Sequence, residues 1–393
     1  MSDGRDNETN NYKSTSVKIK RIRYITAVVL IIFVIFAVFS YREDLTIENF
    51  RYLMKFVDVK PLTFGADENA QINFDSDNST LTGSFKEDLV TVSKTAVKIY
   101  DLSSKELLDS PVSLMKPALE TGEKYFAVYD IGSGYIGIYN SFSKLWEKNF
   151  NYPIFDVSLD MKGNFSLITA EKGYTSVVKV YNDDFENIFN WRSSDKYAVV
   201  SDIMTDSGIY ISVGTIRNNT SGDVVSSLVL LSDSSSKPIA TLDFQSELIV
   251  DLSFNEDRNT VLLTDKALRF IDKTGKILTE VFFNSSSLRK FEVSNQYTAL
   301  VLNEKLVGKN HKVFIFDANG NTYMEKAVVT EITDVALSDN FAFVLGVEDI
   351  TVIDLDTKKL KSYPSERSYR SVHLFDDKNV YLVYDSLAVA LGV

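Results

Sequence analysis

The first hydrophobic feature of the chain is an uncharged run over residues 24–41, which reads YITAVVLIIFVIFAVFSY. Apart from its tyrosines, only Thr26 and Ser40 are polar. A helix of this length is able to cross the ~30 Å hydrocarbon core of a lipid bilayer. The run therefore predicts one transmembrane helix near the N-terminus.

The residues before this run set its predicted orientation. Four basic side chains stand directly before it, at Lys18, Lys20, Arg21 and Arg23. Because basic flanks stay on the cytoplasmic side, residues 1–23 are predicted to be a cytoplasmic tail, and the chain after residue 41 to lie outside the cytoplasm at the cell membrane. A cleaved signal peptide is the alternative, but the apolar run exceeds the usual ~7–15 residues.

A second helical pattern covers residues 42–58. Its apolar positions are Ile47, Phe50, Leu53, Met54 and Val57, at the three- and four-residue spacing of an amphipathic helix. Two interpretations remain open. The helix either lies in the membrane interface or against a partner, or it packs on the underside of the domain that follows.

From residue 59 onward the pattern changes to short alternating apolar runs, broken by Asp, Asn, Gly and Ser, as expected for many strands joined by tight turns. One unit recurs, in which an alternating strand ends in an aromatic or aliphatic residue and is followed by a polar residue and a turn. It occurs at 97–101, 136–140, 178–182, 228–232, 268–272, 313–317, 350–354 and, truncated, 387–390. Its spacing of 37 to 50 residues is typical of four-stranded propeller blades.

The sequence therefore predicts an all-β fold, a β-propeller of about eight four-stranded blades over residues 59–393, with seven blades as the alternative. The last unit ends after its third strand, so one blade lacks a strand. Residues 59–64 are predicted to supply it, which would close the ring and remove exposed sheet edges. A pair of β-sandwiches is the rival fold, but it does not predict a regular period.

The charge is unevenly distributed along the chain. The net charge is −12, but residues 1–23 carry six basic and three acidic side chains, so the tail is +3 and the remainder is −15. An acidic body repels phosphate, so we expect no nucleic-acid partner. There are no cysteines, which excludes disulfides and thiolate chemistry. A protein outside the cytoplasm without disulfides suits a Gram-positive bacterium.

The turn that follows the repeated strand carries a resemblance. Asp272-Lys-Thr-Gly-Lys-Ile, Asp317-Ala-Asn-Gly-Asn and Asn140-Ser-Phe-Ser-Lys-Leu-Trp146 resemble the turns of quinoprotein-type (PQQ-like) propeller repeats. With its basic tail and single predicted anchor, the chain is similar to a family of single-pass, membrane-anchored PQQ-like or WD40-like propellers of unassigned function from Firmicutes. The motifs are general to propellers and specify no chemistry.

The catalytic relatives that this resemblance implies, the quinoprotein dehydrogenases, stack a cofactor on tryptophan. This chain has only Trp146 and Trp191, in two separate units, so no cofactor is expected. No nucleophile elbow, P-loop or metal-binding histidine pair is present in the sequence. His373 is expected to be a satisfied strand residue and His311 a solvated one. Asp75-Ser-Asp77-Asn78 favours a plain Asx turn over a calcium loop.

Two long loops between second and third strands remain as candidate binding elements, at residues 215–225 and 303–311. Extended loops on a rigid scaffold are frequent binding sites. Their candidate residues are Arg217, Asn218, Asn219, Asp223, Lys305, Lys309 and His311. The predicted function is a non-catalytic, membrane-tethered binding or scaffold propeller that engages an envelope protein, peptide or glycan. The alternative is a propeller enzyme, such as a hydrolase, a lyase or a quinoprotein-like oxidoreductase.

Overall fold

The computed structural model of the protein describes residues 26, 28–30, 32–33, 70–77, 79–219, 221–303, 310–365 and 367–392. The chain divides into two compact units, residues 1–60 and residues 61–393. In the first unit, residues 26, 28–30 and 32–33 are helical. None of the helices in the described part of the chain is long and apolar enough to span a membrane. The tail 1–23, most of the run 24–41 and the helix predicted over 42–58 lie outside the described residues.

The described residues of the second unit form 32 strands in eight antiparallel sheets of four strands each, and one short 3₁₀ helix, η2 (Ser285–Ser287). The first four sheets are formed by β2 (Leu81–Phe85), β3 (Asp88–Val92), β4 (Ala96–Tyr100) and β5 (Glu106–Pro111); β6 (Pro117–Thr121), β7 (Phe126–Asp130), β8 (Tyr135–Tyr139) and β9 (Lys144–Asn149); β10 (Asp156–Leu159), β11 (Phe165–Glu171), β12 (Tyr174–Tyr181) and β13 (Asn187–Ser193); β14 (Tyr197–Thr205), β15 (Ile209–Asn218), β16 (Val224–Ser232) and β17 (Ala240–Gln245).

The other four sheets are formed by β18 (Ile249–Phe254), β19 (Thr260–Thr264), β20 (Ala267–Ile271) and β21 (Ile277–Phe282); β22 (Leu288–Val293), β23 (Tyr297–Asn303), β24 (Asn310–Asp317) and β25 (Thr322–Val329); β26 (Ile332–Leu337), β27 (Phe341–Gly346), β28 (Asp349–Asp354) and β29 (Leu360–Pro364); β30 (Ser371–Leu374), β31 (Asn379–Tyr384), β32 (Leu387–Gly392) and β1 (Gln71–Asn73).

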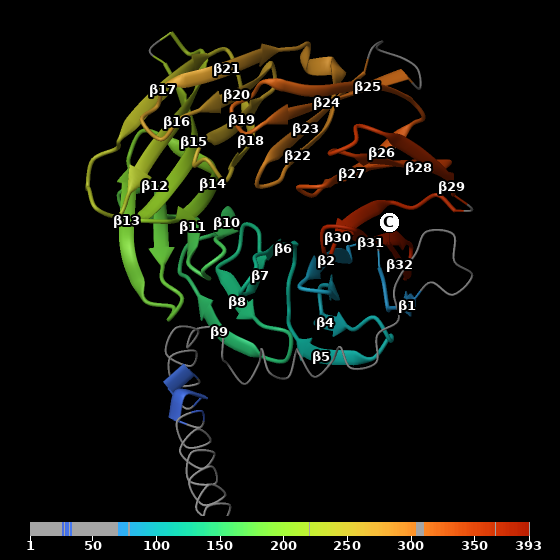
Figure 1. Cartoon of the computed structure of the whole chain (residues 1–393). Helices are drawn as coiled ribbons and strands as arrows, with labels where there is room; N and C mark the ends of the chain where they lie inside the picture. Colours follow the sequence, from blue (N-terminus) through green and yellow to red (C-terminus); the bar gives the residue numbers. More distant parts are fainter. Residues whose placement is uncertain are drawn as a thin grey trace, which may run out of the picture. The chain divides into compact units, whose positions relative to one another are not determined.

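The sheets are the blades of a propeller and are arranged in a ring (Figure 1). The first strand of each blade is the innermost strand. Innermost strands of successive blades lie side by side, as β10 does beside β14 and β14 beside β18, and β2 lies beside β30 across the closure. The prediction of eight four-stranded blades is confirmed, and each repeated segment of the sequence is the third strand of its blade.

The ring is closed by pairing between the two ends of the propeller sequence. β1 pairs with β32 in antiparallel register, Gln71 opposite Val389 and Asn73 opposite Leu387, and so becomes the outer strand of the last blade. The predicted pairing of the ends is confirmed, but the assignment of that strand to residues 59–64 is wrong. The strand is formed by residues 71–73, where Ile72 is fully buried among the core side chains of that blade.

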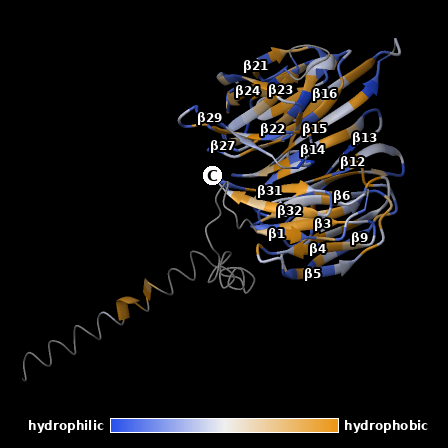
Figure 2. Ribbon diagram, turned by 90° about the vertical axis from the view of Figure 1, so that its right-hand side faces the viewer, coloured by the Kyte–Doolittle hydropathy of each residue, from blue (hydrophilic) through white to orange (hydrophobic). Residues whose placement is uncertain are grey.

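The core lies between neighbouring blades. The second and third strands are covered on both sides, so β7, β19 and β20 are buried at every position, whereas the outer strand β9 has no buried residue. Figure 2 shows hydrophobic residues concentrated along strands such as β31 and β32. A strand buried on both faces needs a nearly continuous apolar sequence. This requirement explains why the third strands are the most regular part of the repeat.

The turn after the third strand is held by its first polar residue. Oδ1 of Asp272 accepts hydrogen bonds from the backbone N–H groups of Thr274 and Lys276, at 2.8 and 2.9 Å. Asp317 does the same for Asn319 and Asn321. The fourth residue of the turn takes a left-handed conformation, which glycine adopts without strain, as at Gly320 with φ of 84°. An added Cβ at Gly320 would meet the ring of Phe270.

Candidate functional site: the acidic channel and its mouth

The innermost strands surround a channel made of three adjoining cavities of about 890, 520 and 340 Å³. Glu120 on β6 and Glu292 on β22 line all three. Side chains alternate along a strand, so one face of each inner strand looks into the channel while the other packs on the blade. The channel therefore runs along the inner faces of blades far apart in the sequence.

Six consecutive inner strands each place a carboxylate on the channel wall. These residues, here called the carboxylate ring, are Glu120, Asp156, Asp202, Asp251, Glu292 and Asp334. The two remaining inner strands contribute His373 on β30 and Thr82 on β2. The wall is consequently acidic over three quarters of its circumference.

Three members of the carboxylate ring, Asp156, Asp202 and Asp334, link neighbouring blades. Asp156 on β10 accepts the backbone N–H of Ser201 on β14 at 2.7 Å, and Asp202 on β14 accepts that of Phe254 on β18 at 2.7 Å. Inner strands of adjacent blades belong to different sheets and share no backbone ladder. These carboxylates satisfy backbone N–H groups that would otherwise face the gap between blades.

The last part of the wall is linked in a similar way. Asp334 on β26 accepts the backbone N–H of Val372 on β30 at 3.0 Å, and its other oxygen lies 3.0 Å from Nζ of Lys290. Nε2 of His373 lies 2.9 Å from Oγ1 of Thr82, across the closure of the ring. The expectation that His373 is a satisfied strand residue agrees with these contacts.

The two glutamates differ from these linkers. Within the described residues, neither Glu120 nor Glu292 has a hydrogen bond or an ion pair, although both face the channel. Removal from bulk water raises the pKa of Glu292 to about 8, and the nearby charges of Asp334 and Asp251 add to that shift. Burial also raises the pKa of Glu120 well above its usual range.

The aspartates of the ring are shifted less. Burial raises the pKa values of Asp156 and Asp202 to about 6, and the hydrogen bonds that they accept oppose the shift. The pKa of Asp251 is raised by the same cause. Burial lowers the pKa of His373 to about 4, so its imidazole is neutral at physiological pH. The wall therefore carries fewer charges near neutral pH than its six carboxyl groups would suggest.

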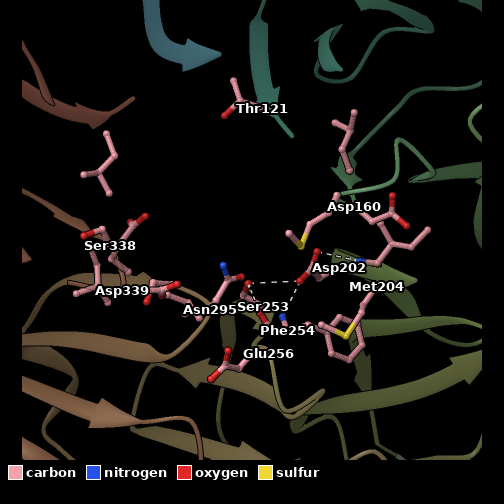
Figure 3. Close-up of a pocket in the computed structure, with 18 of the residues that line it drawn as sticks. Thr121, Asp160, Asp202, Met204, Ser253, Phe254, Glu256, Asn295, Ser338 and Asp339 are labelled. Atoms are coloured by element: carbon pink, nitrogen blue, oxygen red, sulfur yellow. Dashed lines mark hydrogen bonds between the residues drawn. The ribbon is translucent and has the colours of Figure 1, made fainter. Parts of the chain in front are cut away.

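The largest cavity opens as a funnel at the face that carries the turns between first and second strands. Figure 3 shows Asp202, Asn295 and Asp339, from three separate blades, around the open space. The funnel has nine acidic lining residues: Glu120, Asp160, Asp202, Asp206, Glu256, Glu292, Asp339, Asp376 and Asp377. Its one basic lining residue, Arg258, is paired with Asp206 at 2.8 Å. The mouth is thus a negatively charged funnel with apolar side chains, among them Met161 and Phe254.

The described residues of the first predicted binding loop, 215–225, lie at the opposite end of the blades. Arg217 and Asn218 belong to β15, and Arg217 is paired with Asp243 at 2.7 Å. Asn219 organises the turn to β16, because its Oδ1 accepts the backbone N–H groups of Ser221 and Asp223, each at 2.9 Å. Four of the seven candidate residues therefore come together at one hairpin end, away from the funnel.

The second predicted loop, residues 303–311, differs from the prediction at His311. Lys305 and Lys309 lie outside the described residues. His311 is not a solvated loop residue, because it lies on β24 opposite Asn303 and exposes only 3% of its surface. Both of its ring nitrogens lack a hydrogen-bond partner among the described residues, and burial lowers its pKa. It is a buried strand residue.

The other sequence candidates also have defined places. Oδ1 of Asp77 accepts the backbone N–H of Ser79 at 2.7 Å, which is the expected Asx turn. Trp146 and Trp191 lie on the outer strands β9 and β13, and neither lines the cavities of the channel. Where residues are described, no group of three or more His, Asp or Glu side chains is arranged to hold a metal ion.

Four members of the carboxylate ring lie in a recurrent sequence pattern. In each of four inner strands an aspartate precedes an aliphatic residue, in Phe155-Asp-Val, Ser201-Asp-Ile, Val250-Asp-Leu and Thr333-Asp-Val. Aligning the inner strands in the same way as the third strands would reveal the recurrence. It was missed because a single aspartate in an alternating strand is ordinarily a solvent-facing residue.

Fold and site together define an eight-bladed, end-closed β-propeller with an acidic channel. The chain belongs to DUF5711, a family of unknown function whose model matches residues 66–389. No curated protein matches the sequence.

Several solved propellers share the fold. The Dos1 propeller is 11% identical and has a TM-score of 0.59, with 84% of this chain and 95% of that chain covered. BamB from Moraxella catarrhalis is 9% identical, with a TM-score of 0.53 and coverage of 82% and 98%. The WD40 domain of SCAP from fission yeast is 11% identical, with a TM-score of 0.53 and coverage of 85% and 97%. At these identities the likeness concerns the fold alone.

Proposed function

We propose that this protein is a non-catalytic binding or scaffold propeller, tethered to a bacterial cell membrane by residues 24–41, which engages a protein, peptide or glycan of the cell envelope. A propeller fold is consistent with a binding or scaffold role. The tether is supported by the uncharged run and its basic flank. The fold alone selects no ligand.

The observation that carries the proposal is the funnel at the channel mouth. It offers a concave space of about 890 Å³ on a closed and rigid ring, which is within the usual size of ligand sites. Its nine acidic lining residues face one paired arginine. Electrostatic complementarity therefore favours a partner whose contacting groups are cationic, such as a segment rich in lysine or arginine, over an anionic one.

Capture of partners in the native membrane tests the proposal. The full-length protein is cross-linked in its own membrane and purified, beside a variant with Glu256→Lys and Asp377→Lys. Both side chains are exposed at the funnel rim. The matched control carries Asp184→Lys and Glu186→Lys, the same charge change at exposed positions on a turn between third and fourth strands that does not line the funnel.

The comparison has three informative outcomes. Partners that are lost from the rim variant and retained by the control support binding at the funnel. Partners that survive the rim substitutions but are lost when the hairpin end at residues 219–223 is shortened support the loop face instead. An absence of partners for every variant contradicts a binding role and favours the enzyme alternative.

A further inference from the structure

The six members of the carboxylate ring face one another across a confined channel. Glu120 and Glu292 line all three cavities, and Asp156, Asp202 and Asp251 line one cavity with them. Like charges that share a confined space repel each other, and the repulsion is stronger where little water screens them. Every strand that contributes a carboxylate is therefore affected by the charge on the others.

Few opposite charges compensate the ring. Lys290 on β22 is paired with Asp334 on β26, and its charge opposes the rise in the pKa of Glu292. Arg258, which lines the largest cavity, is paired with Asp206. On the β30 side, Arg370 lies close enough to affect His373, which is itself neutral. Thr82 on β2 carries no charge. Lys290 and Arg258 are each already paired with a carboxylate, so full ionisation of the six carboxyl groups would leave an excess of negative charge along the inner strands.

We propose that the carboxylate ring is a proton-linked clasp, in which protons taken up by Glu120 and Glu292 reduce the charge of the channel and so relieve the repulsion between the inner strands. Lowering the pH from mildly alkaline to neutral stabilises the propeller against unfolding. Alkaline conditions charge the wall, push the inner strands apart and leave the channel more attractive to cations.

The direction of the effect follows from proton linkage. The pKa of Glu292 is about 8 in the folded protein, whereas an unperturbed glutamate has a pKa of about 4.3. The folded state therefore binds more protons than the unfolded state between these values, so stability falls as pH rises through about 8. Glu120 has the same sign of shift.

The histidines act in the opposite direction at lower pH. Burial lowers the pKa values of His311 and His373 in the folded protein. The protein therefore loses stability through these histidines only at pH values below the ordinary histidine pKa of about 6.5. The pKa of Glu292, about 8, lies within the interval from pH 6.5 to pH 8.5. Asp156 and Asp202, with pKa values of about 6, are largely ionised throughout it.

Thermal unfolding of the full-length protein in a neutral detergent tests the clasp. We expect the unfolding temperature to rise by about 2–4 °C when the pH is lowered from 8.5 to 6.5. Glu292→Gln removes one titrating group without changing its shape, so the rise should become smaller. Glu123→Gln, at an exposed position outside the channel, serves as the control and should keep the full rise.

Two results would overturn the proposal. One is an unfolding temperature that stays constant or falls on acidification across this interval. The other is a rise that persists unchanged in both Glu292→Gln and Glu120→Gln, since the protons would then bind elsewhere. If Glu292→Gln does not fold, Glu120→Gln alone decides the question, because it removes the other unpaired glutamate of the same wall.

Discussion

The innermost and third strands come from the same repeat, yet they use their sequences in different ways. The third strand β20 is buried at all five positions, whereas the inner strand β18 buries only two of six. Third strands stack between blades, and inner strands have one face on the channel. The buried strands therefore specify the propeller fold, whereas the side chains on the channel face of the inner strands can be charged.

The largest expected effect breaks a third strand. Phe270 on β20 is fully buried, and its ring lies 5.9 Å from that of Phe316. Phe270→Ala should lower the free energy of unfolding by about 3–5 kcal/mol because it leaves a cavity between blades. Urea denaturation measures the loss. Phe282→Ala, on an exposed position of the outer strand β21, should cost less than about 0.5 kcal/mol.

A smaller effect is expected on an inner strand. Asp202→Ala removes the acceptor for the backbone N–H of Phe254 and for Oγ of Ser158. Leaving these donors unpaired should lower the free energy of unfolding by about 1–3 kcal/mol. Asp202→Asn keeps one acceptor oxygen and should recover part of the loss. A larger loss for Asp202→Ala than for Phe270→Ala would contradict the division of roles between the strands.

The third prediction concerns the stability of the protein at acidic pH. The pKa of His373 is about 4 in the folded protein, so the unfolded chain binds a proton first as the pH falls below about 6.5. Stability contributed by the neutral imidazole is therefore lost as the pH falls from 6.5 toward 4. His373→Gln should reduce the stability lost between pH 7 and pH 5 by about 1–2 kcal/mol. Chemical denaturation at the two pH values gives this difference, and equal losses in both proteins would refute it.

The smallest effect is expected at the predicted binding loop. Asn219→Ala removes two hydrogen bonds of an exposed turn, and it should cost about 0.5–1 kcal/mol in the free energy of unfolding. The same denaturation assay measures it. A cost as large as that of Phe270→Ala would mean that this hairpin supports the blades rather than extending from them.

The fold was predictable because its regularity lies in the buried strands. The apolar third strands and their Asx turns recur at a readable period, from 97–101 to 387–390. The closing strand was placed wrongly because residues 59–64 also contain apolar residues upstream of the first complete blade, and only the register of 71–73 with β32 identifies the strand. A three-residue strand gives too weak a pattern to be located by sequence alone.

The site was less predictable than the fold. Residues 215–218 and 224–225 extend strands β15 and β16 rather than form an open loop, and Thr215 and Val225 are fully buried there. His311 was expected to be solvated because it follows a predicted loop, although the strand register places it opposite Asn303. The carboxylate ring requires knowledge of which face of each inner strand points into the channel, and one sequence does not supply that knowledge.

The most direct test of the central claim, that the acidic channel mouth is the binding surface, is site-specific photo-cross-linking in the native membrane. A photo-reactive amino acid is placed at position 256 on the funnel rim, at position 184 on the same face outside the funnel, or at position 219 on the opposite end of the blades. We expect a cross-linked partner from position 256 and from neither of the other two. A partner captured at position 219 but not at position 256 would contradict it.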